Sequence, residues 1–240
     1  MSEEVNDTYT LKADLSEKAH KSAFLLYIFL AALFIGSLIT CNLIANKFIE
    51  INLGFKTVVI SAGVLPYPIT FLITDVLSEV YGRKRTNHVV ISGFIVSLFV
   101  LFILWLGHIF PAIDGSPVTD ESYNQVFKNS DRVILSSMTA YLTAQLVDVR
   151  LFHFWKKLTK GKHLWLRNNA STLVSQIVDT TLVVGIIFYD RESVGTIVGY
   201  IGDGWLFKAS AALIDTAFIY LIMYGIRRVF KLKVGQEIHL

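Results

Sequence analysis

The chain has 240 residues, of which 53% are hydrophobic and 17% are charged, whereas soluble domains carry roughly 25% charged residues. Hydrophobic runs of about 18 residues or more recur along it, and this pattern indicates a polytopic membrane protein. Its single cysteine, Cys41, excludes an internal disulfide and a zinc site built from cysteines.

We predict an all-α fold of six membrane-spanning helices, with a broken second helix and both termini in the cytoplasm. The expected spans cover residues 23–46, 57–81, 89–110, 133–155, 168–189 and 205–226. They form one membrane domain, residues 23–228, between an N-terminal cytoplasmic tail (1–22) and a C-terminal cytoplasmic tail (229–240). Residues 1–21 are too charged and too acidic for a signal peptide, so we expect a disordered or loosely amphipathic cytosolic leader.

The orientation follows from the distribution of positive charge. Sixteen of the 22 lysines and arginines lie in residues 1–22, in the expected tight basic loop at residues 82–85, in the region 150–167, and in the C-terminal residues from Arg227 on. The positive-inside rule places that side in the cytoplasm. Residues 156–167 are expected to be a basic loop on the same side. The acidic connector 111–131 is expected to be a water-exposed loop outside.

The second span is interrupted by Pro66 and Pro68 and charged by Asp75 and Glu79. A helix begun by Pro68 and ended by Gly82 is roughly 22 Å long, which is short of the hydrocarbon core of about 30 Å. We therefore expect a non-helical segment before it, which at that depth must lie against protein or a polar cavity. Such broken spans often build binding sites. The alternative is a proline-kinked span whose carboxylates lie near the interface.

Two Gln-x-x-Asp pairs, Gln145 with Asp148 and Gln176 with Asp179, each project an amide and a carboxylate from one helix face. Asn168 extends the second pair into a polar stripe, and Asp179 lies about 16 Å further along the helix, near the bilayer midplane. Asp215 lies at a similar depth in the sixth span. Because intramembrane carboxylates cost roughly 2.5–3.5 kcal/mol each, they are expected to face a cavity or a partner.

Structural roles remain open for several of these groups. Glu79 has Arg83 four residues on, as in an interfacial helix pair. Arg150 is placed to neutralise Asp75 or Asp148, and a relation between Lys208 and Asp215 would also be structural. The histidines show no metal-ligand spacing and no nucleophile–base arrangement is visible, which argues against a metal site or a membrane hydrolase. We expect no enzyme activity and no cofactor.

Four segments resemble the queuosine precursor transporter family, which was formerly grouped with vitamin uptake transporters. They are Ile73-Thr-Asp-Val-Leu-Ser-Glu-Val-Tyr-Gly82, Ala144-Gln-Leu-Val-Asp148, Leu151-Phe-His-Phe-Trp155, and Arg167-Asn-Asn-Ala-Ser-Thr172 with Gln176 and Asp179. The likeness extends from the first span to the sixth. One departure is Ala170, where the family's Asn-Asn-Gly-Ser-Thr pattern has glycine. It weakens any expectation of close backbone approach there and leaves the polar residues in place.

The resemblance implies an inner-membrane importer of 7-cyano-7-deazaguanine (preQ0) or 7-aminomethyl-7-deazaguanine (preQ1), precursors of the tRNA base queuosine. A carboxylate would accept from the N1–H and 2-amino groups of such a ligand, a Gln or Asn amide would donate to its carbonyl, and aromatic rings would stack on it. The expected substrate-binding residues are Asp75, Glu79, Gln145, Asp148, Asn168, Gln176, Asp179 and Asp215.

Other classes remain open at this point. The main alternative is a vitamin-binding substrate subunit of an energy-coupling-factor importer. The chain has no Walker-type Gly-x-x-x-x-Gly-Lys sequence, so any ATP drive would need a separate ATPase module. A proton-coupled carrier using Asp179 or Asp215 is a further alternative. Expected partners are the small deazapurine and the lipid bilayer, without nucleic acid, and a homo-oligomer stays open.

Overall fold

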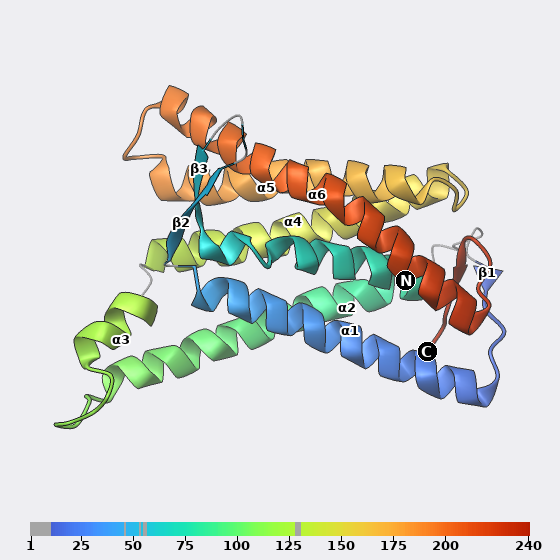
Figure 1. Cartoon of the computed structure of the whole chain (residues 1–240), viewed down its shortest axis with the longest axis horizontal. Helices are drawn as coiled ribbons and strands as arrows, with labels where there is room; N and C mark the ends of the chain where they lie inside the picture. The colour runs from blue at the N-terminus through green and yellow to red at the C-terminus, as the bar shows by residue number, and fades with distance from the viewer. Residues whose placement is uncertain (1–10, 46, 53, 55–56, 128–130) are drawn as a thin grey trace, which may run out of the picture.

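The computed structural model of the chain describes residues 11–45, 47–52, 54, 57–127 and 131–240. Residues 1–10, which form part of the predicted leader, lie outside the described residues. The fold is a bundle of helices joined by short connections (Figure 1). Its helices are α1 (Glu17–Leu43), α2 (Tyr67–Ile109), α3 (Asp120–Phe127), α4 (Asp131–Leu158), α5 (Leu164–Phe188) and α6 (Val194–Phe230).

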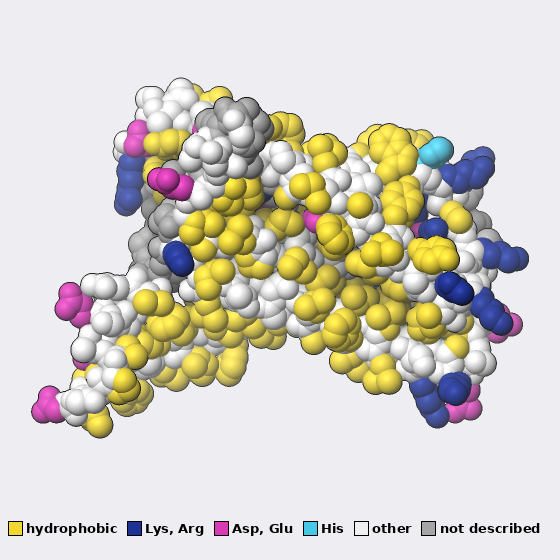
Figure 2. Space-filling model, viewed as in Figure 1, with side chains coloured by type: hydrophobic (Ala, Val, Ile, Leu, Met, Phe, Trp, Pro, Cys, Tyr) yellow, Lys and Arg dark blue, Asp and Glu magenta, His cyan; other side chains and the backbone are white. Residues whose placement is uncertain are grey.

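Within the described part of the chain, four helical stretches are long and apolar enough to cross a membrane: Glu17–Leu43, Ala62–Ile109, Leu164–Phe188 and Val194–Phe230. α4 has 28 residues, and its polar side chains keep it below that level of hydropathy. Hydrophobic side chains cover the middle of the bundle between two ends where the charged residues gather (Figure 2). This distribution is that of a protein whose apolar belt meets lipid. The predicted all-α membrane fold is confirmed at this level.

α2 consists of two segments that run in opposite directions (Figure 1). Gly82 separates residues 67–81 from residues 83–109, with φ 76° and ψ 171° inside an otherwise helical run. Only glycine adopts such a backbone conformation readily. The predicted start beside Pro68 and the predicted end at Gly82 are confirmed. The predicted basic loop 82–85 is wrong, because a single glycine makes the reversal and Arg83 to Arg85 are already helical.

The non-helical stretch expected before this helix is present. Strands β2 (Phe48–Asn52) and β3 (Thr57–Ser61) pair as an antiparallel hairpin, and a 3₁₀ turn, Ala62–Val64, follows. The Ser61 hydroxyl donates to the Ala45 carbonyl at 2.6 Å and accepts from the Gly63 N–H at 3.1 Å. These bonds fix the entry to α2 beside the end of α1. The hairpin itself was not predicted.

Residues 67–81 form the centre of the bundle. Every residue from Ile73 to Gly82 is buried. Their apolar side chains join a core that includes Phe34 of α1, Tyr141 of α4 and Ile219 of α6. A helix buried on all sides reads as apolar throughout, so the carboxylates of Asp75 and Glu79 within it require partners.

Two further boundaries differ from the predictions. α5 begins at Leu164, and α6 begins at Val194 rather than near residue 205. The glycines at 195, 199, 202 and 204 favour a loop by their intrinsic propensity, yet they lie within the helix. The predicted basic loop 156–167 is reduced to the short connection between α4 and α5, since Lys156 is helical in α4 and Arg167 in α5.

The chain ends return to the bundle. Strand β4 (Gln236–Glu237) pairs in parallel with β1 (Leu11–Lys12). Glu237 and Ile238 are buried, with 7% and 1% of their surface exposed. The predicted tails at residues 1–22 and 229–240 thus include residues that pack against the membrane domain.

Candidate functional site

Asp75 of α2 and Asp148 of α4 form a pair of fully buried carboxyl groups near the middle of the bundle. They lie close enough for the two groups to interact directly. The Oδ1 atom of Asp148 accepts from the Ser175 hydroxyl of α5 at 3.0 Å. Among the described residues, Asp75 Oδ1 and Asp148 Oδ2 have no hydrogen-bond partner. Because an unpartnered buried acceptor is costly, these oxygens mark a place where donors are expected to bind.

Gln145 lies one turn before Asp148, and its side-chain amide forms hydrogen bonds to α2. Its amide nitrogen donates to the Thr70 hydroxyl at 3.4 Å, and its amide oxygen accepts from the Thr74 hydroxyl at 3.3 Å. All three residues are fully buried. Hydrogen bonds of this kind join membrane helices, so Gln145 fixes the position of α4 against the segment that carries Asp75.

Asp179 of α5 is held from two directions. The Tyr67 hydroxyl donates to Asp179 Oδ1 at 2.8 Å, and Lys208 of α6 forms an ion pair with Oδ2. The Lys208 ammonium also lies 4.9 Å from the centre of the Tyr67 ring, within the range of a cation–π interaction. This triad joins the start of α2 to α5 and α6.

The polar stripe of α5 faces the interior, as its periodicity predicts. Asn168 and Gln176 are 2% and 3% exposed, beside buried Ser171, Thr172 and Ser175. The amide oxygen of Gln176 has no hydrogen-bond partner among the described residues. With Asp75 and Asp148, it brings three unpartnered acceptor oxygens to the interior of α2, α4 and α5.

Glu79 has a different environment from the other candidates. It forms ion pairs with Arg167 of α5 at 2.5 Å, Arg227 of α6 at 2.9 Å and Lys156 of α4 at 3.5 Å. Glu79, Arg167 and Lys156 are each at least 90% buried. Within the described chain, Glu79 forms no ion pair with Arg83, so the helix-pair alternative is wrong. Three cations surround this carboxylate, which makes it a junction between helices.

The other two pairing alternatives are also wrong. Arg150 is exposed, and the cation whose charge reaches Asp75 is Arg167. Lys208 pairs with Asp179 and not with Asp215. Asp215 is partly buried and forms no hydrogen bond or ion pair with the described residues, although its charge acts on Asp75. The structure therefore brings Asp75, Asp148, Gln145, Gln176 and Asp179 into one interior region and leaves Asp215 at its edge.

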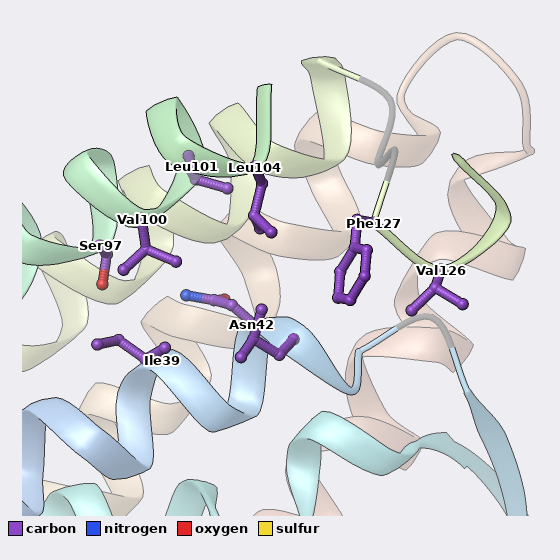
Figure 3. A pocket seen from close by; sticks show the side chains of 9 residues that line it. Ile39, Asn42, Ser97, Val100, Leu101, Leu104, Val126 and Phe127 are labelled. Carbon is purple, nitrogen blue, oxygen red and sulfur yellow. The ribbon is translucent and has the colours of Figure 1, made fainter. Parts of the chain in front are cut away.

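A small groove lies elsewhere, between α1, residues 83–109 of α2, and α3. Asn42 and Ser97 point into it among apolar side chains that include Ile39, Leu104 and Phe127 (Figure 3). Ser97 is 2% exposed, so this part of the predicted third span, residues 89–110, faces the interior and not lipid. Among the described residues, no titratable side chain lines the groove, so these residues offer no carboxylate to a polar ligand. The candidate site is therefore the carboxylate region.

Two residues of this region, Tyr67 and Lys208, were not predicted as site residues. A lysine in an apolar run is itself a signal of an intramembrane partner, and that signal was available for Lys208. Tyr67 stands between two prolines, and nothing in the sequence shows that its hydroxyl reaches α5.

A bundle of apolar helices with polar and charged residues gathered inside is typical of multi-pass membrane transporters for small molecules. Residues 61–222 match the family described as "Putative vitamin uptake transporter", and the chain belongs to that family. The chain is therefore a multi-pass transporter of the bacterial inner membrane and not an enzyme.

Curated relatives carry more specific names. The chain is 29% identical over 160 residues to the "Probable queuosine precursor transporter" of Bacillus subtilis (strain 168), covering 66% of this chain and 69% of the relative. It is 25% identical over 189 residues to the "Queuosine precursor transporter" of Escherichia coli (strain K12), covering 72% and 74%. No solved structure matches the chain.

Proposed function

We propose that the chain imports queuosine precursors, preQ0 or preQ1, across the inner membrane. The names of its relatives support a queuosine precursor as cargo. They favour it over the vitamin carried by an energy-coupling-factor subunit. The remaining support comes from the chemistry of the interior site.

One observation carries this proposal. The unpartnered oxygens of Asp75, Asp148 and Gln176 form a site rich in acceptors. A deazaguanine presents an N1–H, a 2-amino group and a pyrrole N–H, and preQ1 adds an aminomethyl group. These donors complement carboxylate and amide oxygens. A site built in this way rejects analogues without the donors, because its own buried groups would remain unpaired.

Asp179 is the second part of the proposed site. Tyr67 and Lys208 each bond to one of its oxygens, which orients the carboxylate while each oxygen keeps capacity for a further donor. The ring of Tyr67 supplies an aromatic face for a flat heterocycle. In this proposal Asp179 and Gln176 accept from the base edge, and the Asp75–Asp148 pair accepts from the remaining donors. Asn168 and Asp215 line its edge.

The topology is part of the proposal. We place six spans across the membrane: α1, the two segments of α2, α4, α5 and α6. The end that carries Lys156, the Arg227–Arg228 pair and the C-terminus would face the cytoplasm, as the positive-inside rule requires. Lys and Arg side chains gather at this end in Figure 2, which supports the assignment.

The test is uptake of labelled preQ0 and preQ1 into proteoliposomes that contain the purified chain. A deazapurine with hydrogen in place of the 2-amino group is the matched ligand control, and we expect it to compete about 100-fold more weakly or worse. In a strain that depends on imported precursor, deletion of the chain should remove queuosine from tRNA. Uptake of neither precursor, with tRNA queuosine unchanged by the deletion, would reject the proposed cargo.

Asp179→Asn tests the site itself. The substitution keeps the size of the side chain and places amide donors where the ligand also has donors. We expect a loss of about 3 kcal/mol, or roughly 100-fold in affinity. Ser97→Ala, in the separate groove of Figure 3, is the control and should bind like wild type. Normal binding by a well-inserted Asp179→Asn variant would place the site elsewhere.

A further inference from the structure

The C-terminal residues 232–240 lie against the end of the buried α2 segment. The Ile238 N–H donates to the Val80 carbonyl at 2.7 Å. The Glu237 carboxylate forms an ion pair with Lys156 of α4 at 2.7 Å. Arg85 donates to the Leu240 carbonyl, and the ring of His20 in α1 lies 3.1 Å from the His239 carbonyl. The C-terminal residues thus contact α1, α4 and both segments of α2.

Some of these contacts provide hydrogen-bond partners for the carbonyl groups at the end of a helix. Gly82 ends the first segment of α2, and the last turn of a helix leaves carbonyls without intrahelical partners. Lys156 donates to the carbonyls of Ser78 and Glu79 at 3.3 and 3.1 Å, and the Ile238 N–H donates to the carbonyl of Val80. A cation at this position also suits the negative end of the helix dipole. The helix that carries Asp75 is therefore ended jointly by α4 and by the C-terminal residues.

The same place holds the Glu79 junction. Glu79 binds Lys156, Arg167 and Arg227, and Lys156 in turn binds Glu237. Two carboxylates and three cations from α2, α4, α5, α6 and the C-terminal residues thus form one network, which is buried except at Arg227. Glu79 follows Asp75 by one helical turn, a distance of about 6 Å along the axis. The network therefore lies between the Asp75 carboxyl group and this end of the α2 segment.

We propose that residues 232–240, together with the Glu79 network, form the cytoplasmic gate of this transporter, and that the structure shows the gate closed. The assignment rests on the proposed transport function and orientation. Release of cargo to the cytoplasm requires the Glu237–Lys156 ion pair and the Ile238–Val80 hydrogen bond to break, which frees the end of the α2 segment. Glu237 is the gating residue, because it is the acid that joins the chain end to the network. Gly82 allows close approach, since a Cβ atom there would collide with the Glu237 carboxylate.

The first experiment measures opening directly in the full-length chain. Ser78→Cys places a thiol at a fully buried position behind the gate, and Cys41→Ala removes the only native thiol. A membrane-impermeant maleimide is applied from the cytoplasmic side. In this background Glu237→Gln should speed modification about tenfold or more, because a lost charge-assisted bond shifts an opening equilibrium by that factor. Glu17→Gln, which removes an exposed Glu17–Lys21 pair, is the matched control and should leave the rate unchanged.

A second measurement separates gating from folding. In the Cys41→Ala background, His20→Cys with His239→Cys allows a flexible bis-maleimide to tether the C-terminal residues to α1. Tethered protein in proteoliposomes should retain equilibrium binding of labelled preQ0 and lose its uptake, whereas each single-cysteine variant keeps both. Normal uptake by the tethered protein would contradict the proposal that the C-terminal residues form a gate. An unchanged maleimide rate in Glu237→Gln would also overturn it. The maleimide rate needs no substrate, so failure of the proposed cargo leaves the test of the gate intact.

Discussion

Lys208 holds its ammonium group against Asp179 and over the ring of Tyr67, so the charge of an intramembrane lysine is balanced by a neighbouring helix. Asp148 and Glu79 likewise bind groups from other helices. Each of these bonds fixes one helix relative to another. The unpartnered oxygens of Asp75 and Gln176, and the second oxygen of Asp148, differ from this pattern, which is why they point to a ligand and not to a packing role.

The Lys208–Asp179 pair can be tested for its part in stability. Lys208→Met alone leaves a buried carboxylate without its cation and should destabilise the protein by about 3 kcal/mol. Adding Asp179→Asn removes the stranded charge, so the double variant should recover part of this loss. Thermal unfolding of purified protein in detergent measures the cycle. Lys21→Met, in an exposed ion pair, should have no measurable effect. Strict additivity of the two buried substitutions would show that the residues do not interact.

Tyr67→Phe isolates the hydroxyl from the ring. The phenylalanine keeps an aromatic face and loses the donor to Asp179, a bond to a charged group worth about 1.5–3 kcal/mol. We expect labelled preQ0 to bind roughly tenfold more weakly or worse, because the carboxylate is no longer oriented. Tyr224→Phe, at a tyrosine that is 63% exposed, is the control. Equal affinity in both variants would remove Tyr67 from the site.

The side-chain partners were harder to predict than the residues themselves. The spacing of the polar residues in α5 correctly predicted that Gln176 and Asp179 face the interior, because helical spacing alone sets which residues share a face. The partner of Asp179 depends on how α5, α6 and the start of α2 pack, and no local pattern carries that information. For the same reason Arg167, six residues after a glycine in a basic stretch, was taken for a loop residue although it is fully buried.

At the scale of elements, the first segment of α2 was well predicted and its surroundings were not. Proline at its start and glycine at its end act through local backbone geometry, so both limits were visible in the sequence. The reversal at one residue, the hairpin before the helix and the helical glycines of α6 all depend on tertiary packing, which overrides local propensity. The segment is a short helix, so other parts of the chain must supply the hydrogen-bond partners for the backbone groups at its ends.

Gly82→Ala tests this element. Alanine at φ 76° and ψ 171° is strained by about 1–3 kcal/mol, and its Cβ would also displace the Glu237 carboxylate. We expect a clear drop in the unfolding temperature and faster maleimide modification of Ser78→Cys. Gly225→Ala in α6, where a Cβ meets no neighbouring atom, is the control and should be neutral or stabilising by up to about 1 kcal/mol. Equal stability of the two variants would contradict the strained reversal.

At the scale of the whole molecule, charge is divided between the two ends of the bundle and apolar surface covers the middle (Figure 2). Exposed side chains such as Phe29, Phe99 and Leu221 belong to that belt. The order of apolar and charged segments in the sequence predicted an apolar middle between charged ends. The free energy of transfer into lipid depends on residue type and little on packing detail. The same argument supplies the orientation, which has a direct test.

Cysteine labelling from the outside of intact cells decides the topology. The α2–α3 and α4–α5 connections lie at opposite ends of the bundle (Figure 1). Ser116→Cys lies in the first connection and Lys162→Cys in the second. If the basic end faces the cytoplasm, an impermeant maleimide should label position 116 in intact cells, whereas position 162 should react only after permeabilisation. Lys233→Cys, exposed near the C-terminus, should behave like position 162. Native Cys41 is buried and gives little background. The reverse pattern would invert the transporter in the membrane, and the proposed gate would then close the outer side.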